Sequence, residues 1–120
     1  MESHFKLHEY STILVVEVLV EKFDFFELSE ASAYLRNILE KRHYPSMVFD
    51  FSRVSFIDSS VFGFLLEIHS STKKNGNEIA VVCIDNSVLH VMTMLKLTDI
   101  IKVFQSREKA GEYLNIKLNL

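Results

Sequence analysis

The stretch that best indicates the fold is Val54-Ser55-Phe56-Ile57-Asp58-Ser59-Ser60-Val61-Phe62-Gly63-Phe64-Leu65-Leu66. Asp58 is suited to the N-cap of a helix, because its carboxylate can accept the free N–H groups of the first helical turn. Ser59 then lies in that first turn, where the positive end of the helix dipole tolerates a phosphate group. We therefore expect a helix from about Ser59 to Lys74, followed by the stop signal Asn75-Gly76-Asn77.

The spacing of apolar residues gives this helix a core face on the side away from Ser59. At about 100° per residue, the residues expected in the core are Val61, Phe64, Leu65 and Ile68. The side of Ser59 carries Gly63 and Leu66, with Phe62 at its margin. A glycine inside a helix costs about 1 kcal/mol relative to alanine, and the close approach of a partner backbone would explain it.

Leu66 and Phe62 would then supply an apolar docking surface beside the Ser59 hydroxyl. The alternative is structural: Gly63 would allow close packing against another helix, and Leu66 would be one of the single exposed leucines that are common on protein surfaces.

Apolar segments of two kinds alternate along the rest of the chain. Runs rich in β-branched residues predict strands at Phe5 to Tyr10 (an edge strand), Thr12 to Val20, Met47 to Phe51, Glu78 to Ile84 and Ile100 to Phe104. Other helices are expected from about Leu28 to Lys41-Arg42, from an N-cap at Asn86 or Ser87 with Val88, Val91, Met92 and Leu95 on one face, and from Ser106 to Leu114. This order of about five strands and four helices indicates an α/β protein with a largely parallel sheet covered by helices.

Composition indicates one globular domain over residues 1–120. The chain is 48% hydrophobic and 24% charged, and its formal net charge of −3 without a basic stripe argues against direct contact with nucleic acid. Cys83 stands alone in an apolar strand, which fits a reducing compartment. The N-terminus lacks the pattern of a signal peptide, and the apolar run Ile13 to Val20 is too short to span a membrane. We expect a cytoplasmic protein without a transmembrane segment.

Common enzyme motifs are missing from the sequence. With only Gly63, Gly76 and Gly111, the chain has no glycine-rich phosphate loop, and no GxSxG elbow occurs. His4 and His8 have a helical metal-ligand spacing, but they lie in an expected strand or at the frayed end of the chain. We therefore expect no enzymatic activity, no cofactor and no metal. A nucleotide-binding protein is the least supported hypothesis, and binding of labelled nucleotide would test it.

Several segments resemble STAS domains, especially those of anti-sigma factor antagonists. The resemblance is carried by Phe49-Asp50-Phe51-Ser52 together with the segment Val54 to Ser60, by Phe23-Asp24, and by Leu95 to Ile100, Val103-Phe104 and Ser106 to Ala110. Val61 and Phe62 stand where the family's motif has Gly-Leu, whereas Gly63 is kept. The resemblance implies a STAS fold for the whole chain, with the helices packed mainly on one face of the sheet.

The resemblance also implies a function. In anti-sigma factor antagonists, the Ser after the Asp is phosphorylated by a serine kinase that is also the anti-sigma factor. The unphosphorylated protein binds this kinase and releases the sigma factor, which regulates transcription, and a phosphatase resets the switch. Ser59 would be the phosphoacceptor, Asp58 the helix cap beside it and Ser60 a secondary candidate. The implied partner-binding residues are Asp24, Phe62, Gly63 and Leu66.

The alternative is an unphosphorylated STAS-type structural subunit of a transporter or lipid-trafficking complex. Such a protein would co-purify with membrane components.

Overall fold

A five-stranded mixed sheet forms the centre of the computed structural model, which describes residues 4–10 and 12–114. Its strands, in spatial order, are β1 (Phe5–Tyr10), β2 (Ile13–Val18), β4 (Ser46–Asp50), β6 (Ile79–Val82) and β7 (Lys102–Phe104). β1 is antiparallel to β2, and all the other neighbouring pairs are parallel. The prediction of an α/β protein with a largely parallel sheet is confirmed.

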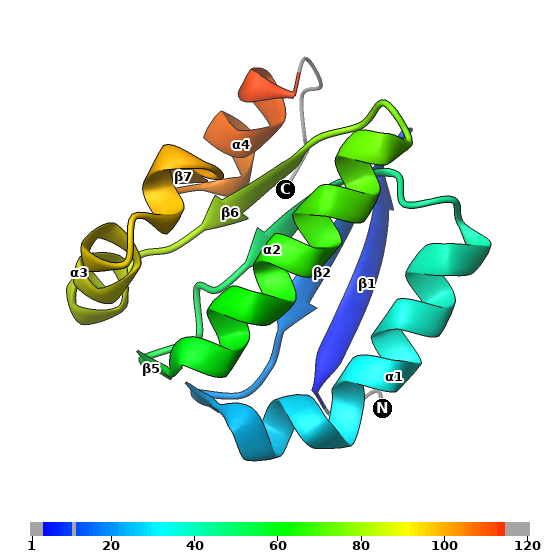
Figure 1. Ribbon diagram of the computed structural model, residues 1–120. Coiled ribbons are helices and arrows are strands. Elements are labelled where there is room, and N and C mark those ends of the chain that lie inside the picture. The colour runs from blue at the N-terminus through cyan, green and yellow to red at the C-terminus, as the bar shows by residue number, and fades with distance from the viewer. Residues whose placement is uncertain (1–3, 11, 115–120) are drawn as a thin grey trace.

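Helices cover both faces of this sheet unequally. They are α1 (Phe25–Lys41), α2 (Ser59–Lys74), α3 (Asn86–Met94), the short 3₁₀ helix η1 (Leu97–Asp99) and α4 (Arg107–Tyr113). Figure 1 shows α2 between α1 and α3. Residues of α1, α2 and α3 share one core, whereas Ala110 of α4 belongs to a smaller core on the opposite face. Of the four α-helices in the described residues, three therefore pack on one face, as predicted.

Strand alternation explains the two cores. Leu14 and Val16 of β2 point to the larger core under α1 to α3, and Ile13 and Val15 point to the α4 face. The same alternation occurs in β4 and β6. These central strands are buried on both faces, so they appear in the sequence as continuous apolar runs.

A second, two-stranded sheet lies at the carboxyl edge of the main sheet. Its strands, β3 (Lys22–Phe23) and β5 (Phe56–Ile57), are parallel. α1 begins shortly after β3 and α2 shortly after β5, so the N-termini of both helices lie beside this small sheet (Figure 1). The sequence did not predict these two strands, since two residues are too few to show a periodic pattern.

Most expected strands differ from the structure by one or two residues at their ends, and the helices differ in three places. α1 begins at Phe25, before the predicted Leu28, because Asp24 caps it. The N-cap of α3 is Asp85 and not Asn86 or Ser87, since the Asp85 carboxylate accepts hydrogen bonds from two amides of the first turn. Leu95, predicted on one face of this helix with Val88, Val91 and Met92, lies outside it and is exposed, because α3 ends at Met94 and the chain then turns.

Candidate functional site

Asp58 holds the start of helix α2, as the sequence predicted. Its backbone is extended, and Oδ1 accepts hydrogen bonds from the Ser60 amide (3.1 Å) and from the Ser60 hydroxyl. Ser60, two residues after the cap, therefore donates two hydrogen bonds to a single carboxylate oxygen, and this fixes the direction of the first helical turn. The two serines that follow Asp58 are thereby placed differently.

The second oxygen of Asp58 reaches a different helix. Oδ2 accepts a hydrogen bond from the Phe25 amide at 2.9 Å, in the first turn of α1. That turn is capped by Asp24, whose Oδ1 accepts from the Glu27 amide at 3.0 Å. One carboxylate therefore joins the N-termini of α1 and α2, which the sequence could not show because the two residues are 33 positions apart.

Asp58 is ionised at neutral pH. Partial burial raises its pKa, but hydrogen bonds from the Ser60 hydroxyl and from the amides of Phe25, Ser60 and Val61 lower the pKa below its usual value. A carboxylate stabilised in this way is a poor proton donor or acceptor near pH 7. Its geometry is that of a structural cap and of a fixed negative charge next to Ser59.

Ser59 and Ser60 present their hydroxyls differently. The Ser59 side chain is exposed, and none of the described residues forms a hydrogen bond with its hydroxyl. Ser60 is half-buried and its hydroxyl donates to Asp58. Of these two serines, Ser59 has the more accessible hydroxyl.

The predicted docking residues divide into two groups. Gly63 and Leu66 are exposed on the outer side of α2, and Leu66 shows 39% of its surface. Phe62, predicted to be part of the docking surface, is a core residue with only 6% exposed. The prediction for Phe62 is wrong because α2 lies between α1 and α3 (Figure 1), so its buried face is wider than the stripe given by helical periodicity. Val61 points into the core, as expected.

Gly63 has open space on its outer side. A Cβ atom built at this position would meet nothing within 4 Å in the described structure. Close packing against another helix, the structural alternative, is therefore not the reason for this glycine. The backbone of α2 is exposed one turn after Ser59.

Asp24 has a structural task in the free protein. Besides capping α1, its carboxylate lies 3.9 Å from the ammonium group of Lys22. It is half-buried, so only part of the side chain is accessible beside Asp58.

Sequence reasoning missed an exposed set of aromatic side chains, which we call the aromatic rim: Phe25, Phe26 and Phe56. Phe25 and Phe26 are 67% and 65% exposed in the first turn of α1, and Phe56 is exposed on β5, with the Lys22 ammonium 5.5 Å from its ring centroid. The hydrogen bond from Phe25 to Asp58 places this turn beside the start of α2. Helical geometry could have identified Phe26, which lies about 160° from the buried Leu28.

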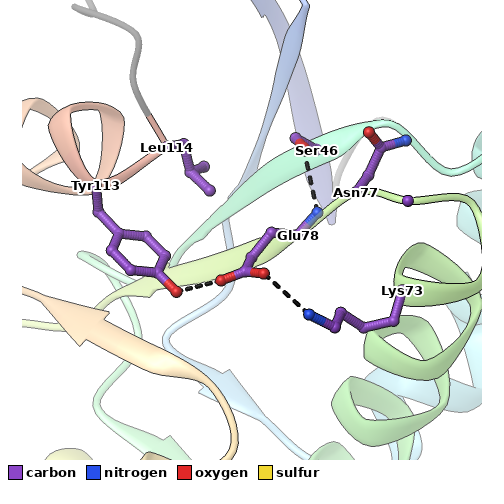
Figure 2. Close-up of a pocket in the computed structure, with 7 residues that line it drawn as sticks. Ser46, Lys73, Asn77, Glu78, Tyr113 and Leu114 are labelled. Carbon is purple, nitrogen blue, oxygen red and sulfur yellow. Dashed lines mark hydrogen bonds and ion pairs between the residues drawn. The ribbon is translucent and has the colours of Figure 1, made fainter.

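The other chemically notable features lie elsewhere. A depression of about 420 Å³ lies at the amino ends of β4 and β6. Figure 2 shows that its Glu78 accepts from the Tyr113 hydroxyl and pairs with Lys73 at 3.2 Å. Lys73 is about 21 Å along α2 from Ser59, at 1.5 Å per residue, so this depression is separate from the serine site.

The histidines considered as metal ligands bond to carboxylates. His4 Nε2 lies 2.6 Å from Glu27, and His8 Nε2 lies 2.9 Å from Glu17. Cys83 is buried, and burial raises the pKa of its thiol. Within residues 4–10 and 12–114, no helix is both long and apolar enough to cross a membrane.

The fold and the capped serine pair together define an α/β domain with an exposed serine hydroxyl at a helix N-terminus. A family model for the STAS domain matches residues 4–110. The chain belongs to the STAS domain family.

Solved structures with the same fold include proteins of two kinds. A putative anti-sigma factor antagonist from Thermotoga maritima superposes with a TM-score of 0.81 at 18% identity, covering 92% of this chain and 94% of that one. The Bacillus cell fate determinant SpoIIAA, in its phosphorylated form, gives a TM-score of 0.67 at 16% identity, with 91% and 97% covered. The murine anion transporter Slc26a9 gives 0.68 at 19% identity, with 90% of this chain but 18% of the transporter covered.

Proposed function

We propose that this protein is an anti-sigma factor antagonist that binds a serine kinase with anti-sigma activity, and that phosphorylation of Ser59 ends this binding. The observation that carries the proposal is the contrast between the two serines: Ser59 is exposed and unbonded, whereas the Ser60 hydroxyl is held by Asp58. A kinase requires a hydroxyl that it can reach and deprotonate. The proposal is also supported by membership of the STAS family and by a fold shared with SpoIIAA, which has been solved phosphorylated.

The surface around Ser59 supplies area for a partner. In the aromatic rim, Phe25 and Phe26 begin α1, whose first turn donates to Asp58, and Phe56 lies on β5, three residues before Ser59. Gly63 and Leu66 are exposed along α2 itself. Aromatic side chains contribute much of the binding energy in protein interfaces, because they bury large area with few torsions to fix. Gly63 lets a partner backbone approach the helix closely. We assign Asp24 and Asp58 to the edge of this interface and exclude Phe62 from it.

Phosphorylation would oppose binding through electrostatics. A phosphoserine carries about −1.5 to −2 charges near pH 7, and Asp58 is already ionised beside it. A bound kinase places the γ-phosphate of ATP next to the same oxygen, so the complex brings like charges together in a partly dehydrated site. In the free protein, water and the N-terminus of α2 stabilise the phosphate. The phosphorylated form therefore favours the free state.

The regulatory consequence is partner exchange. The unphosphorylated protein occupies the kinase, the sigma factor is released, and a phosphatase that removes the phosphate restores binding. The protein would act in the cytoplasm through protein contacts, without touching nucleic acid and without catalysis or a cofactor of its own.

The second candidate function is a STAS subunit of a transporter complex, favoured by the fold shared with murine Slc26a9. In that role the Ser59 hydroxyl would stay unmodified, and the aromatic rim would contact a membrane protein. The two functions differ in the state of Ser59 and in the kind of protein that co-purifies.

Phosphosite mass spectrometry on protein isolated from its own cells, with bound proteins identified in the same sample, tests the proposal. We expect phosphate on Ser59, its retention in Ser60→Ala, its loss in Ser59→Ala, and a serine kinase bound to Ser59→Ala. Unmodified Ser59 under growth and stress, with transport proteins bound, would replace the proposal with the second candidate.

A further inference from the structure

A cluster of charged side chains lies at the carboxyl edge of the sheet, on the face opposite to α2. We call it the Arg107 cluster: Arg107, Asp50, Glu17, Arg53 and His8. Arg107 Nε donates to Asp50 Oδ2 at 2.6 Å, and its Nη2 lies 3.2 Å from Glu17 Oε1. His8 Nε2 and Arg53 Nε lie 2.9 Å and 3.5 Å from the Glu17 carboxylate. The cluster therefore joins side chains from β1, β2, β4 and α4 and from the loop after β4.

Arg107 offsets the repulsion between the carboxylates of Asp50 and Glu17. Asp50 is only 4% exposed and pairs with Glu17 across β2 and β4, so two negative charges lie side by side. Burial opposes the charge on Arg107, but the neighbouring carboxylates raise its pKa. Burial alone would raise the pKa of Glu17, but His8, Arg107 and Arg53 lower it by more, so the pKa of this carboxyl lies below its ordinary value. An uncompensated buried carboxylate is strongly destabilising.

The position of Arg107 in its own helix also points to this task. It is the first residue of α4, whose N-cap is Ser106. A cation at a helix N-terminus opposes the helix dipole. The two carboxylates of the sheet, and not α4 itself, therefore explain an arginine at this position.

The cluster holds the loop that leads to Ser59. The oxygen of Asp50 that does not contact Arg107 accepts from the Ser52 amide at 2.9 Å and from the Ser52 hydroxyl. Arg53, the next residue, reaches Glu17. The chain is then fixed by hydrogen bonds from the Val54 amide to Phe51 and from the Ser55 amide to Glu21.

The next residues along the chain form β5, which pairs with β3, and Asp58 then caps α2. Arg107 and its carboxylate partners thus hold the first residues of the segment that leads along the chain to the start of α2.

We propose that Arg107 is a positioning residue for Ser59: from the opposite face of the sheet, it fixes the loop of residues 51–57 that carries β5 and the phosphoacceptor. This inference deepens the proposed function, on which it rests for the role of Ser59. Its structural half concerns the isolated protein and can be tested without a partner.

Amide hydrogen exchange, followed by NMR on the full chain, tests the structural half. In Arg107→Gln we expect the amides of Ser52, Ser55 and Phe56 to exchange about tenfold faster or more, as the loss of a hydrogen bond to a charged group predicts. The matched control is Arg36→Gln, which removes a two-pronged pair with Glu67 between α1 and α2 and should leave these amides unchanged.

Two milder variants cover the case in which Arg107→Gln does not fold. Arg107→Lys keeps the positive charge but loses the planar fork that contacts both carboxylates, and Ser52→Ala removes only the hydroxyl. Both should accelerate exchange in residues 52–56 selectively, and Arg107→Lys less than Arg107→Gln. Acceleration spread evenly over all strands, or none in residues 52–56, would overturn the inference.

The second part of the inference, that Arg107 positions Ser59 for phosphorylation, is tested by the rate at which the co-purifying kinase phosphorylates Ser59. The rate is measured under conditions in which wild type and variant are both fully folded. We expect Arg107→Lys to be phosphorylated several-fold more slowly, and Arg36→Gln at the wild-type rate. Equal rates for wild type and Arg107→Lys would refute the positioning role. A wild-type protein that no kinase phosphorylates would refute the proposed function instead, while the exchange result would still decide the structural half.

Discussion

The double role of Asp58 gives a quantitative prediction, because Asp85 provides a matched control. Asp85 Oδ1 accepts from the Ser87 amide at 2.9 Å, the Val88 amide at 3.0 Å and the Ser87 hydroxyl. Asp58 caps α2 in the same way, through the Ser60 amide and hydroxyl and the Val61 amide. Only Asp58 also binds the first turn of another helix, through the Phe25 amide. The difference between Asp58→Ala and Asp85→Ala therefore isolates the bond between α1 and α2.

The expected magnitudes follow from these contacts. Loss of an N-cap costs about 1 kcal/mol, which is the whole effect expected for Asp85→Ala. Asp58→Ala also loses the hydrogen bond from Phe25, which contributes about 1 kcal/mol because water competes at this half-exposed carboxylate. We expect about 2 kcal/mol for Asp58→Ala and about 1 kcal/mol for Asp85→Ala. At about 4 °C per kcal/mol for a domain of this size, the falls in Tm are about 8 °C and 4 °C.

Urea unfolding followed by circular dichroism measures both free energies, and pH adds a second test. The folded-state pKa of Asp58 is lowered, so its stabilising contribution is present above the ordinary carboxyl pKa near 4 and is lost as the pH falls through the folded-state value. The difference between wild type and Asp58→Ala should shrink below about pH 4. Equal losses for Asp58→Ala and Asp85→Ala at neutral pH would show that the bond to Phe25 does not stabilise the protein.

Three further predictions concern residues of α1 and α2 near Ser59. Phe62→Ala should destabilise by about 3 kcal/mol in urea unfolding, because the ring is buried; a loss below about 1 kcal/mol would contradict its burial. Gly63→Ala should stabilise α2 by up to about 1 kcal/mol, since a Cβ there meets nothing within 4 Å, and a destabilised variant would reveal a contact on that side. Phe26→Ser should change stability by less than about 0.5 kcal/mol but weaken capture of the kinase; unchanged capture would remove Phe26 from the docking surface.

Periodicity predicted the parts of the fold in which burial is simple. The core face of α2 and the continuous apolar strands β2, β4 and β6 all follow from the spacing of their apolar residues. The same reasoning failed at Phe62, because periodicity assumes one buried stripe and α2 has neighbours on two sides (Figure 1). The predicted cap of α3, Asn86 or Ser87, lies one or two residues after the true cap, Asp85, because aspartate, asparagine and serine are all good cap residues and the sequence does not distinguish between neighbours of this kind.

The candidate site could be located in the sequence but not completed there. Asp58, Ser59 and Gly63 lie close together in the sequence, and local rules for helix caps and helix faces suffice for them. The aromatic rim and the Arg107 cluster depend on contacts between segments distant in sequence, such as Phe25 with Asp58 and Arg107 with Asp50. Local patterns carry no information about such contacts, so only the folded structure brings these residues together.

The most direct test of the switch is the affinity of one purified partner for both states of the protein. The kinase that co-purifies with Ser59→Ala would be titrated, by calorimetry, with unphosphorylated protein, with protein phosphorylated on Ser59, and with Ser60→Ala as a control. We predict that phosphorylation weakens binding by about fivefold to 150-fold, the usual range of coupling between two sites, and that Ser60→Ala binds like wild type. Equal affinity of the phosphorylated and unphosphorylated forms would contradict the switch, however tightly both forms bind.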